Sequence, residues 1–391
     1  YYSIHGRHFS AGEILLNKAV APDPNEKVPL ALRIECLTRA ANSYSLAMQS
    51  TLPSSNMMSM IGGYRRDRAL QDRQVSVETL KANIKAIEEK LDIAKIQQRV
   101  LTTVDQSQNV DLKPEKLDAL RFKLVSVSEL YNDYACELNL FDVCLLILNT
   151  CNHNEREGIE TLWKSVICEE ILPCQTTSAI AISFLTQLKQ GSPFEEETVM
   201  QSGDYGNDLQ SFDNGEWIPR LRNRVTALGK ELYGKGADYT VPLDLIVQAL
   251  EGLRQAYSEM HKENKLSQSW PIETMLNVGV PFDALYQSYD SIYLEVDGHI
   301  DATIRLHWLA SIHELLKMWV NEAFSNHVSS ASSEGSSASS QLAQAVKNGG
   351  LVERIKAYNA TLEGLVEGNS ADIDEVKIGF REVEEAIRKG F

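Results

Sequence analysis

Residues 242–293 read PLDLIVQALEGLRQAYSEMHKENKLSQSWPIETMLNVGVPFDALYQSYDSIY and carry the clearest structural signal in the chain. Their apolar residues recur at spacings of three and four, which is the period of an amphipathic helix. Gly279 follows one apolar run and Pro281 opens the next, an arrangement typical of a helix C-cap followed by a new helix. So short a connection predicts a tight hairpin of two helices, the unit from which antiparallel stacks are built.

The same helical period recurs along most of the sequence, and runs with strand-like alternation are absent. The predicted helical segments are 28–50, 75–104, 115–151, 155–171, 176–190, 215–233, 242–264, 281–296, 303–324, 350–366 and 371–389. At 391 residues the chain is longer than one compact domain usually grows. We therefore predict an all-α protein, an irregular α-solenoid of stacked antiparallel helices without a regular sequence repeat.

The segment 75–104 shows how such a helix is covered. One apolar stripe follows its whole length, and from Ile93 onward Ile96, Val100 and Val104 add a second stripe. A helix with two apolar stripes is buried from two sides, as happens inside a stack. A three-heptad coiled coil is the alternative, because the first stripe fits an a/d pattern that only Gln98 interrupts.

Helix starts and long connections are also visible in the sequence. Four pairs of residues have the spacing of a capping box, and each predicts a helix start: Ser126 with Glu129, Asn154 with Glu157, Asp213 with Glu216, and Asp372 with Glu375. Three stretches lack the helical period and are predicted to be mobile surface loops: 50–74, 191–214 and the Ser-rich 325–340.

Composition limits the classes of partner. The 38 Lys and Arg against 54 Asp and Glu leave a net charge of −16, which repels nucleic-acid phosphates and anionic lipid. The longest strongly apolar runs, 143–148 and 179–185, are far shorter than the roughly 20 residues that cross a bilayer. The sequence begins with Tyr1 and has no charged-then-apolar leader, so we expect a piece of a longer protein. We predict no direct nucleic-acid partner and no membrane span.

No pattern of catalytic, cofactor-binding or metal-binding residues stands out. The six cysteines have neither zinc nor disulfide spacing and are predicted to be buried, reduced thiols. His313 and Glu314 begin a motif like that of a zinc protease, but Lys317 stands where the second histidine would be needed. His307 lies on a different face of its helix from His313. We therefore predict no catalytic site, no cofactor and no metal site.

Two basic clusters have the chemistry to hold a phosphate or an acidic peptide: the four arginines at Arg65, Arg66, Arg68 and Arg73, and the pair Arg220 and Arg224. Because the chain is so acidic, local ion pairs or a solvated face are the favoured interpretation of both.

Aromatic residues concentrate in the last third of the chain. Most of them are expected to form core between helices, but aromatics that are only partly covered make the kind of groove in which a peptide side chain anchors. The terminal helix of a stack also lacks a neighbour on one side. The residues predicted to bind a peptide are Tyr286, Tyr289, Tyr293, Trp308, Trp319, Tyr358, Leu362, Leu365 and Phe380.

The order of motifs resembles one known family. The resemblance rests on PLDLIVQ at 242–248, Trp270 with IETM at 272–275, NVGVP at 277–281, LDIAKIQ at 91–97, and Leu162 with Trp163. Together they are similar to the C-terminal α-solenoid of the large inner-ring scaffold nucleoporins, the 155-kDa class of vertebrates and the 157/170-kDa class of fungi. In that family the full protein has an N-terminal β-propeller that contacts the membrane, so we expect no membrane contact from this stretch.

The resemblance implies a non-enzymatic role in the nuclear pore complex of the nuclear envelope, within the nucleus. The expected partners are short linear motifs of linker nucleoporins and other inner-ring nucleoporins, in support of transport of protein and mRNA. A vesicle-coat or tethering-complex α-solenoid is the second hypothesis, and a helical enzyme with an unrecognised polar site is the third. An enzyme would need converging polar groups with perturbed ionisation in a closed pocket.

Overall fold

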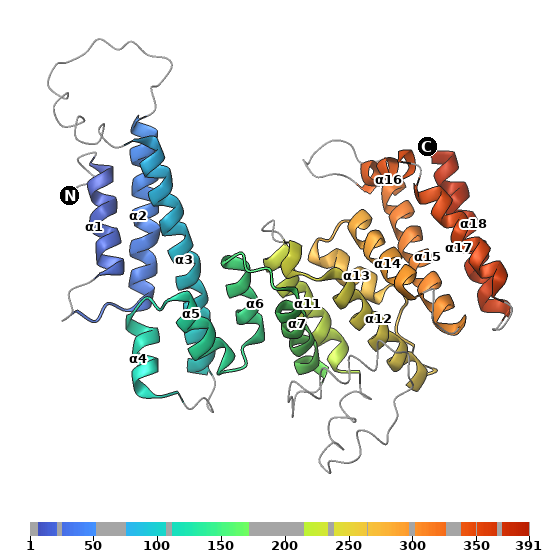
Figure 1. Ribbon diagram of the computed structural model, residues 1–391, viewed down its shortest axis with the longest axis horizontal. Helices are drawn as coiled ribbons and strands as arrows, with labels where there is room; N and C mark the ends of the chain where they lie inside the picture. The colour runs from blue at the N-terminus through green and yellow to red at the C-terminus, as the bar shows by residue number, and fades with distance from the viewer. Residues whose placement is uncertain are drawn as a thin grey trace, which may run out of the picture. The chain divides into compact units, whose positions relative to one another are not determined.

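Figure 1 shows the computed structural model. The structure describes residues 7–21, 26–51, 76–106, 112–171, 215–233, 238–263, 265–296, 302–325, 338–348, 350–365 and 370–390. Over these ranges the chain forms helices and turns and contains no strand, which confirms the all-α prediction. It divides into two compact units, Tyr1–His153 and Asn154–Phe391, and each is described by itself.

The first unit is built on three long helices that lie side by side. They are α1 (His8–Val20), α2 (Leu30–Thr51) and α3 (Val77–Gln106), followed by α4 (Pro114–Phe122), α5 (Val127–Glu129), the π-helical turn η2 (Leu130–Cys136) and α6 (Phe141–Thr150). Helix α2 packs against both α1 and α3, and α6 packs on the far part of α3. Sequence periodicity missed α1, and 50–74 lies almost wholly outside the described residues, so that predicted loop stays a prediction.

Helix α3 is covered from two sides along its second half. Ile96, Val100 and Val104 are all buried, in agreement with the predicted second stripe. Gln97 is also fully buried, and its side-chain amide holds the turn after α4: Nε2 donates to the carbonyl oxygens of Leu120 (2.8 Å) and Lys123 (2.7 Å). Packing within the chain, and not a coiled coil, therefore accounts for the pattern of α3.

The segment 115–151 was predicted to be helical with a helix start inside it at Ser126, and the structure divides it at two points. The chain leaves α4 at Lys123 with an extended backbone and restarts at Ser126, whose hydroxyl accepts from the amide of Glu129 while the Glu129 carboxylate accepts from the amide of Ser126. The predicted capping box is thus confirmed. A second break follows η2, where Asn139 has a φ of +53°. Buried polar contacts and local caps override a helical period that continues through both breaks.

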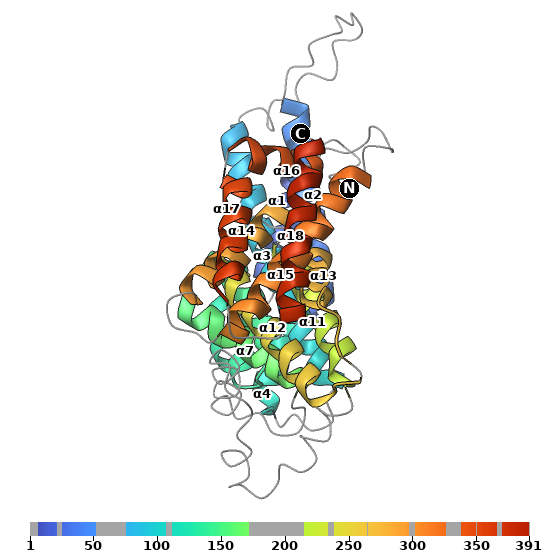
Figure 2. The ribbon, with the colours of Figure 1, turned by 90° about the vertical axis from the view of Figure 1, so that its right-hand side faces the viewer.

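The second unit is a stack of antiparallel helices. Its elements are α7 (Arg156–Ile171), α11 (Trp217–Tyr233), η3 (Asp238–Thr240), α12 (Leu243–Met260), α13 (Trp270–Val278), α14 (Phe282–Val296), α15 (Ala302–Ser325), α16 (Ala338–Lys347), α17 (Gly350–Gly364) and α18 (Ser370–Gly390). Helix α11 packs on α7 and α13, α14 on α12 and α15, and α18 on α15 and α17. Figures 1 and 2 both show α17 and α18 as an adjacent pair.

Tryptophans fill the first half of this unit. Trp163 and Trp217 are completely buried, and the ring of Trp217 meets that of Trp270 edge to face with 6.0 Å between centroids. The indole Nε1 of Trp163 donates to the carbonyl oxygen of Thr240 at 2.8 Å, so the η3 turn is fixed to α7. Two of these residues, Trp163 and Trp270, belong to the motifs that carry the family resemblance.

The hairpin between α13 and α14 forms as predicted. Gly279 is the C-cap of α13, with a left-handed backbone at φ +104° and ψ 13°. Its amide donates to the carbonyl oxygen of Leu276 (3.0 Å), and the amide of Val280 donates to that of Met275 (3.2 Å). These two bonds satisfy the last carbonyls of α13 and fix the direction in which α14 leaves.

The helix starts predicted at Asn154 and Asp372 are displaced in the structure. Helix α7 begins at Arg156 and α18 at Ser370, so Asn154 lies before the cap position of α7 and Asp372 lies inside the first turn of α18. Neither is the cap that the sequence spacing predicted. Asp213, the helix 176–190 and the loop 191–214 lie outside the described residues. The Ser-rich stretch 325–340 is described only at its ends, where Ala338–Ser340 form the first residues of α16.

Candidate peptide-docking site

The residues predicted to bind a peptide come together, but mainly inside the second unit. Seven of the nine are buried: Tyr289, Tyr293, Trp308, Trp319, Tyr358, Leu362 and Phe380. Tyr286 and Leu365 are half-buried. The expectation that this aromatic stripe is mostly core is therefore confirmed, whereas the predicted ligand role of its members is not tested by the fold. In this structure the seven buried side chains support a surface but do not form one.

A chain of ring contacts joins four helices through these residues. The ring of Tyr358 on α17 meets that of Tyr293 on α14 edge to face at 5.6 Å and that of Phe380 on α18 at 5.5 Å. Nearer the start of α14, Tyr286 lies 6.3 Å from Trp319 of α15, measured between ring centroids. Aromatic pairs at such distances stabilise packing beyond the area that they bury. The cluster thus fixes the spacing of the last helices of the unit.

A half-buried polar network reinforces the same helices. The Arg354 guanidinium donates to Asp290 at 2.7 Å, and the hydroxyl of Tyr358 donates to the same carboxylate oxygen at 2.5 Å. The hydroxyls of Tyr286 and Tyr358 are 3.1 Å apart. Burial raises the pKa of Tyr286 to about 12 and that of Tyr358 further still, so both phenols stay neutral donors. Helices α14 and α17 are therefore linked by an ion pair that two phenols surround.

A second network lies between α12, α14 and α15. Glu251 is completely buried, and its carboxylate accepts from Arg254 (3.0 Å) and from the hydroxyl of Tyr289 (2.8 Å), while the imidazole of His307 lies 3.3 Å away. Burial alone would raise the pKa of Glu251. The His307 hydrogen bond, the Arg254 charge and the Tyr289 hydroxyl instead lower it to about 2. The carboxylate is thus ionised and paired in the core, where it connects three helices.

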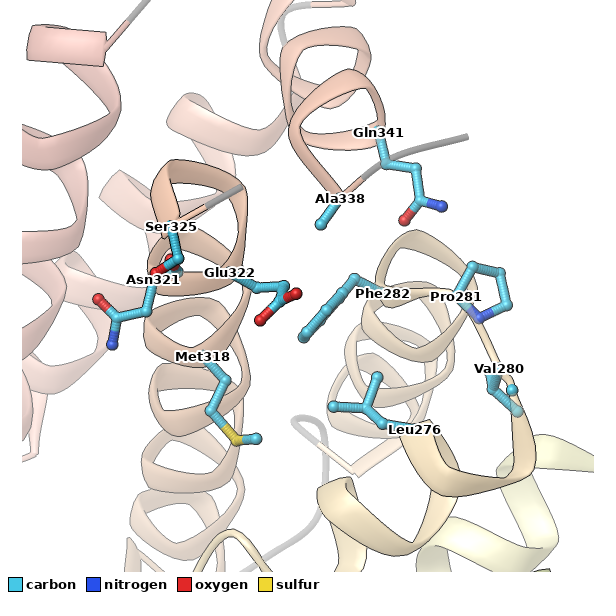
Figure 3. Close-up of a pocket in the computed structure, with 11 residues that line it drawn as sticks. Leu276, Val280, Pro281, Phe282, Met318, Asn321, Glu322, Ser325, Ala338 and Gln341 are labelled. Atoms are coloured by element: carbon cyan, nitrogen blue, oxygen red, sulfur yellow. The ribbon is translucent and has the colours of Figure 1, made fainter. Parts of the chain in front are cut away.

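An open groove of about 630 Å³ lies where α14 begins. Figure 3 shows Phe282 at its centre, with the apolar side chains of Leu276, Pro281 and Met318 around it. These four side chains are only half-buried, although the turn that supplies three of them is fixed by the backbone bonds of Gly279. The groove therefore offers partly exposed apolar surface on a preformed framework.

Polar side chains form the rim of this groove. Asn321, Glu322 and Ser325 come from α15, and Gln341 comes from α16. The segment 326–337, which links α15 to α16, lies outside the described residues. An apolar floor with a polar, acidic rim matches the general anatomy of a small protein-interaction site.

Trp319 connects the predicted aromatic cluster to the groove from behind. Its ring stacks on Phe282 with 6.0 Å between centroids and 5° between planes, and its indole Nε1 donates to the carbonyl oxygen of Ala338 at 3.0 Å. Trp319 therefore holds the floor and the α16 edge of the groove together, although it does not line it. None of the nine predicted residues lines the groove. Sequence reasoning had marked Gly279–Pro281 as a turn and missed that this turn makes a groove wall.

The remaining sequence predictions have simpler outcomes. Arg220 and Arg224 pair with Glu170 (3.7 Å) and Glu169 (3.9 Å), in agreement with the favoured ion-pair interpretation. The cluster at Arg65–Arg73 lies outside the described residues. The imidazole of His313 packs edge to face on Phe380, and its burial lowers its pKa.

Within the residues that the structure describes, no group of three or more His, Cys, Asp or Glu side chains is placed to hold a metal ion. No helix there is both long enough and apolar enough to cross a bilayer. The cysteines depart in part from expectation. Cys36, Cys144 and Cys168 are buried, but Cys136 and Cys151 are exposed, and Cys174 lies outside the described residues.

Comparison with known proteins gives a consistent result. Residues 1–356 match the family described as non-repetitive/WGA-negative nucleoporin C-terminal. Nuclear pore complex protein Nup154 of Drosophila melanogaster is 27% identical over 195 residues, which is 48% of this chain and 12% of that protein. Nucleoporin NUP170 of Saccharomyces cerevisiae is 28% identical over 165 residues, which is 42% of this chain and 9% of that protein. The chain thus spans a small part of these relatives.

Solved structures of Chaetomium thermophilum Nup170 share the fold. A mutant of its CTD superposes with a TM-score of 0.63 at 16% identity, covering 100% of this chain and 62% of that one. The CTD crystallised in complex with Nup145N gives a TM-score of 0.59 at 16% identity, covering 98% and 60%. At such low identity these matches establish the fold alone, and they confirm the predicted α-solenoid class.

Proposed function

The chain belongs to the non-repetitive/WGA-negative nucleoporin C-terminal family, and on that premise we propose that it is a scaffold segment of the inner ring of the nuclear pore complex. It serves nucleocytoplasmic transport by holding a short linear motif of a linker nucleoporin, and it acts at the nuclear envelope without catalysing a reaction. Family membership is the observation that carries this proposal, because the match extends over residues 1–356.

Partner binding is supported by a structural neighbour. Nup170 of Chaetomium thermophilum was crystallised with Nup145N, and its CTD shares the fold of this chain. We therefore assign this chain a partner of the same kind, a linker segment that binds in extended or helical form. The two named relatives are both pore proteins, which favours the scaffold role over a vesicle-coat or tethering subunit.

We place the linker motif in the groove at the start of α14. A linker segment brings only a few side chains, so its binding needs a surface that is ordered beforehand. Phe282 and Met318 provide half-exposed apolar area, and the Gly279 turn and the Trp319 stack hold that area in place. Glu322 on the rim and the net charge of −16 favour a motif with a basic flank.

The nine predicted residues keep a proposed role in binding, as the layer beneath this surface. Trp319 contacts Phe282 directly, and Tyr286 contacts Trp319 in turn. Replacing Tyr358 or Leu362 by Asp is a poor test of that role, because both side chains are 0% exposed and a buried charge would unfold the unit. Variants at the half-exposed lining residues separate binding from folding.

The test is peptide binding by the full chain, measured by fluorescence anisotropy. Labelled peptides that tile the linker nucleoporins, including the counterpart of Nup145N, are titrated with wild type, Leu276→Glu and the control Leu294→Glu. Leu294 is 52% exposed on α14 and does not line the groove, so both variants add the same charge to a leucine. We expect Leu276→Glu to weaken binding at least about tenfold, as loss of a buried anchor does, and Leu294→Glu to bind like wild type.

The outcomes separate the two parts of the proposal. Equal binding by wild type and Leu276→Glu, with circular dichroism showing both folded, would remove the groove assignment and leave the scaffold role. If no linker peptide bound wild type and a pull-down recovered coat subunits instead, the scaffold role itself would be wrong.

A further inference from the structure

Two cysteines of the first unit lie against each other at its surface. Cys136 is the last residue of η2 and is exposed, and Cys144 lies in α6 and is 0% exposed. Their Sγ atoms are 3.8 Å apart. A disulfide needs the sulfurs at about 2.0 Å, so closure requires the two to approach by roughly 1.8 Å. Rotation of the exposed Cys136 side chain is a small motion of the kind that supplies this.

The backbone holds the two thiols together. Between them the chain turns through Asn139, whose φ is +53°. The amide of Leu138 donates to the carbonyl oxygen of Tyr134 at 2.9 Å, and the amide of Leu140 donates to that of Ala135 at 2.8 Å. The proximity of the thiols is therefore a property of an ordered turn and not of two flexible side chains.

Contacts on each side of the turn fix it further. Asp142, in the first turn of α6, pairs with Arg99 of α3 at 2.7 Å. The hydroxyl of Tyr134, in η2, donates to the carbonyl oxygen of Lys116 of α4 at 3.1 Å. Both elements that carry a thiol are thus attached to neighbouring helices of the same unit.

We propose that Cys136 and Cys144 form a redox-active dithiol, a modification site that glutathione disulfide converts to an intramolecular disulfide. The Cys136 thiolate attacks one sulfur of glutathione disulfide, and a glutathione thiolate leaves. Cys144 then attacks the Cys136 sulfur of the mixed disulfide, and the second glutathione leaves. Two thiol protons and two electrons pass to the oxidant, so one glutathione disulfide becomes two glutathione molecules.

The unequal exposure of the two thiols sets the order in which they react. An outside reagent reaches Cys136, while Cys144 is accessible only through it. Burial raises the pKa of the Cys144 thiol, and the neighbouring Cys136 and Asp142 raise it further. Reduction by attack at Cys136 must expel Cys144, and a thiol of high pKa is a slow leaving group. The disulfide, once formed, persists and braces the turn between η2 and α6.

The test uses the full chain and glutathione disulfide as the oxidant. After incubation, free thiols are blocked with N-ethylmaleimide and peptides are identified by mass spectrometry without reduction. We expect wild type to yield a peptide, or a pair of peptides, in which Cys136 is joined to Cys144 and the mass is lower by the two lost hydrogens, about 2 Da. Alkylation of Cys136 should fall at least about tenfold over the same time.

Three variants check each step. Cys144→Ala should stop at a glutathione adduct on Cys136, and Cys136→Ser should leave Cys144 reduced. Cys151→Ser, which removes the other exposed thiol among the described cysteines, should form the bond like wild type. A wild type that carries glutathione on Cys136 while Cys144 remains a free thiol would overturn the proposal. A disulfide from Cys136 to any other cysteine would overturn it as well.

Discussion

Replacing Gly279 by valine tests the turn on which both the hairpin and the proposed groove depend. Gly279 has a φ of +104°, and a Cβ at this position would have no heavy atom within 4 Å. Steric contact therefore adds nothing, and the cost is that of forcing a β-branched residue into a left-handed backbone, on the order of 1–2 kcal/mol. For a unit of this size, that loss corresponds to a melting temperature lower by roughly 2–8 °C.

The assay is urea and thermal unfolding of the full chain, with amide hydrogen exchange to locate the change. The amides of Gly279 and Val280, which close the C-cap, should lose protection first. Gly364→Val is the matched control, because it too would meet no atom within 4 Å but has no left-handed φ. We expect the control to change stability by less than about 0.5 kcal/mol. Unchanged stability and exchange in Gly279→Val would show that the α13 end does not depend on a left-handed residue.

Two further predictions concern buried polar groups. Glu251 has a pKa lowered to about 2 from 4.5, so its contribution is present above pH 4.5 and is lost as the pH falls toward 2. Glu251→Gln should therefore have a free energy of unfolding about 3 kcal/mol lower than wild type near pH 6. The difference between the urea midpoints of the two proteins should narrow toward pH 2, and a difference independent of pH would contradict this. Gln97→Leu should cost about 3 kcal/mol of unfolding free energy, because three backbone groups lose their partner, whereas the neighbouring half-buried Gln98→Leu should cost little. Equal urea midpoints for the two glutamine variants would refute the role of Gln97.

The fold class could be predicted because it depends on the helical spacing of apolar residues, a pattern that a single exceptional residue rarely obscures. The hairpin at Gly279 was predictable for a stricter reason. A glycine after an apolar run and a proline just inside the next leave the chain few conformations, and the structure shows the one expected. Helices α1 and α16 were missed because Gly12 and the serines around Ala338 weaken the sequence signal, while tertiary packing stabilises both helices.

The breaks within 115–151 needed information from a distant part of the chain. Gln97 is the residue that satisfies the turn after α4, with its side-chain oxygen accepting from the amide of Val125 at 3.1 Å. Its partners are 23 to 28 residues away, and no local pattern marks it as a cap. The sequence could therefore identify the capping box at Ser126 without showing that the preceding helix must stop.

The burial of most of the predicted binding residues could not be foreseen for a related reason, because aromatic type and helical spacing do not reveal which side of a helix the next element covers. Tyr289 and Tyr358 lie on stripes that looked available at the end of a stack, and both are buried. Burial of tyrosine is tolerated there because each hydroxyl has a carboxylate partner, Glu251 for Tyr289 and Asp290 for Tyr358.

The position of the groove follows from the way the second unit is held. Two networks of ionised side chains and a chain of aromatic rings fix α12, α14, α15 and α17 against one another, so these helices cannot move together to fill the groove. The groove lies at the Gly279 turn, where α14 starts within three residues of the end of α13 and one face of Phe282 is left partly uncovered. A rigid stack with a partly uncovered aromatic would bind a short motif at little ordering cost to itself. The buried aromatic cluster and the open groove are thus two consequences of the same packing, and the first is what makes the second a candidate for binding.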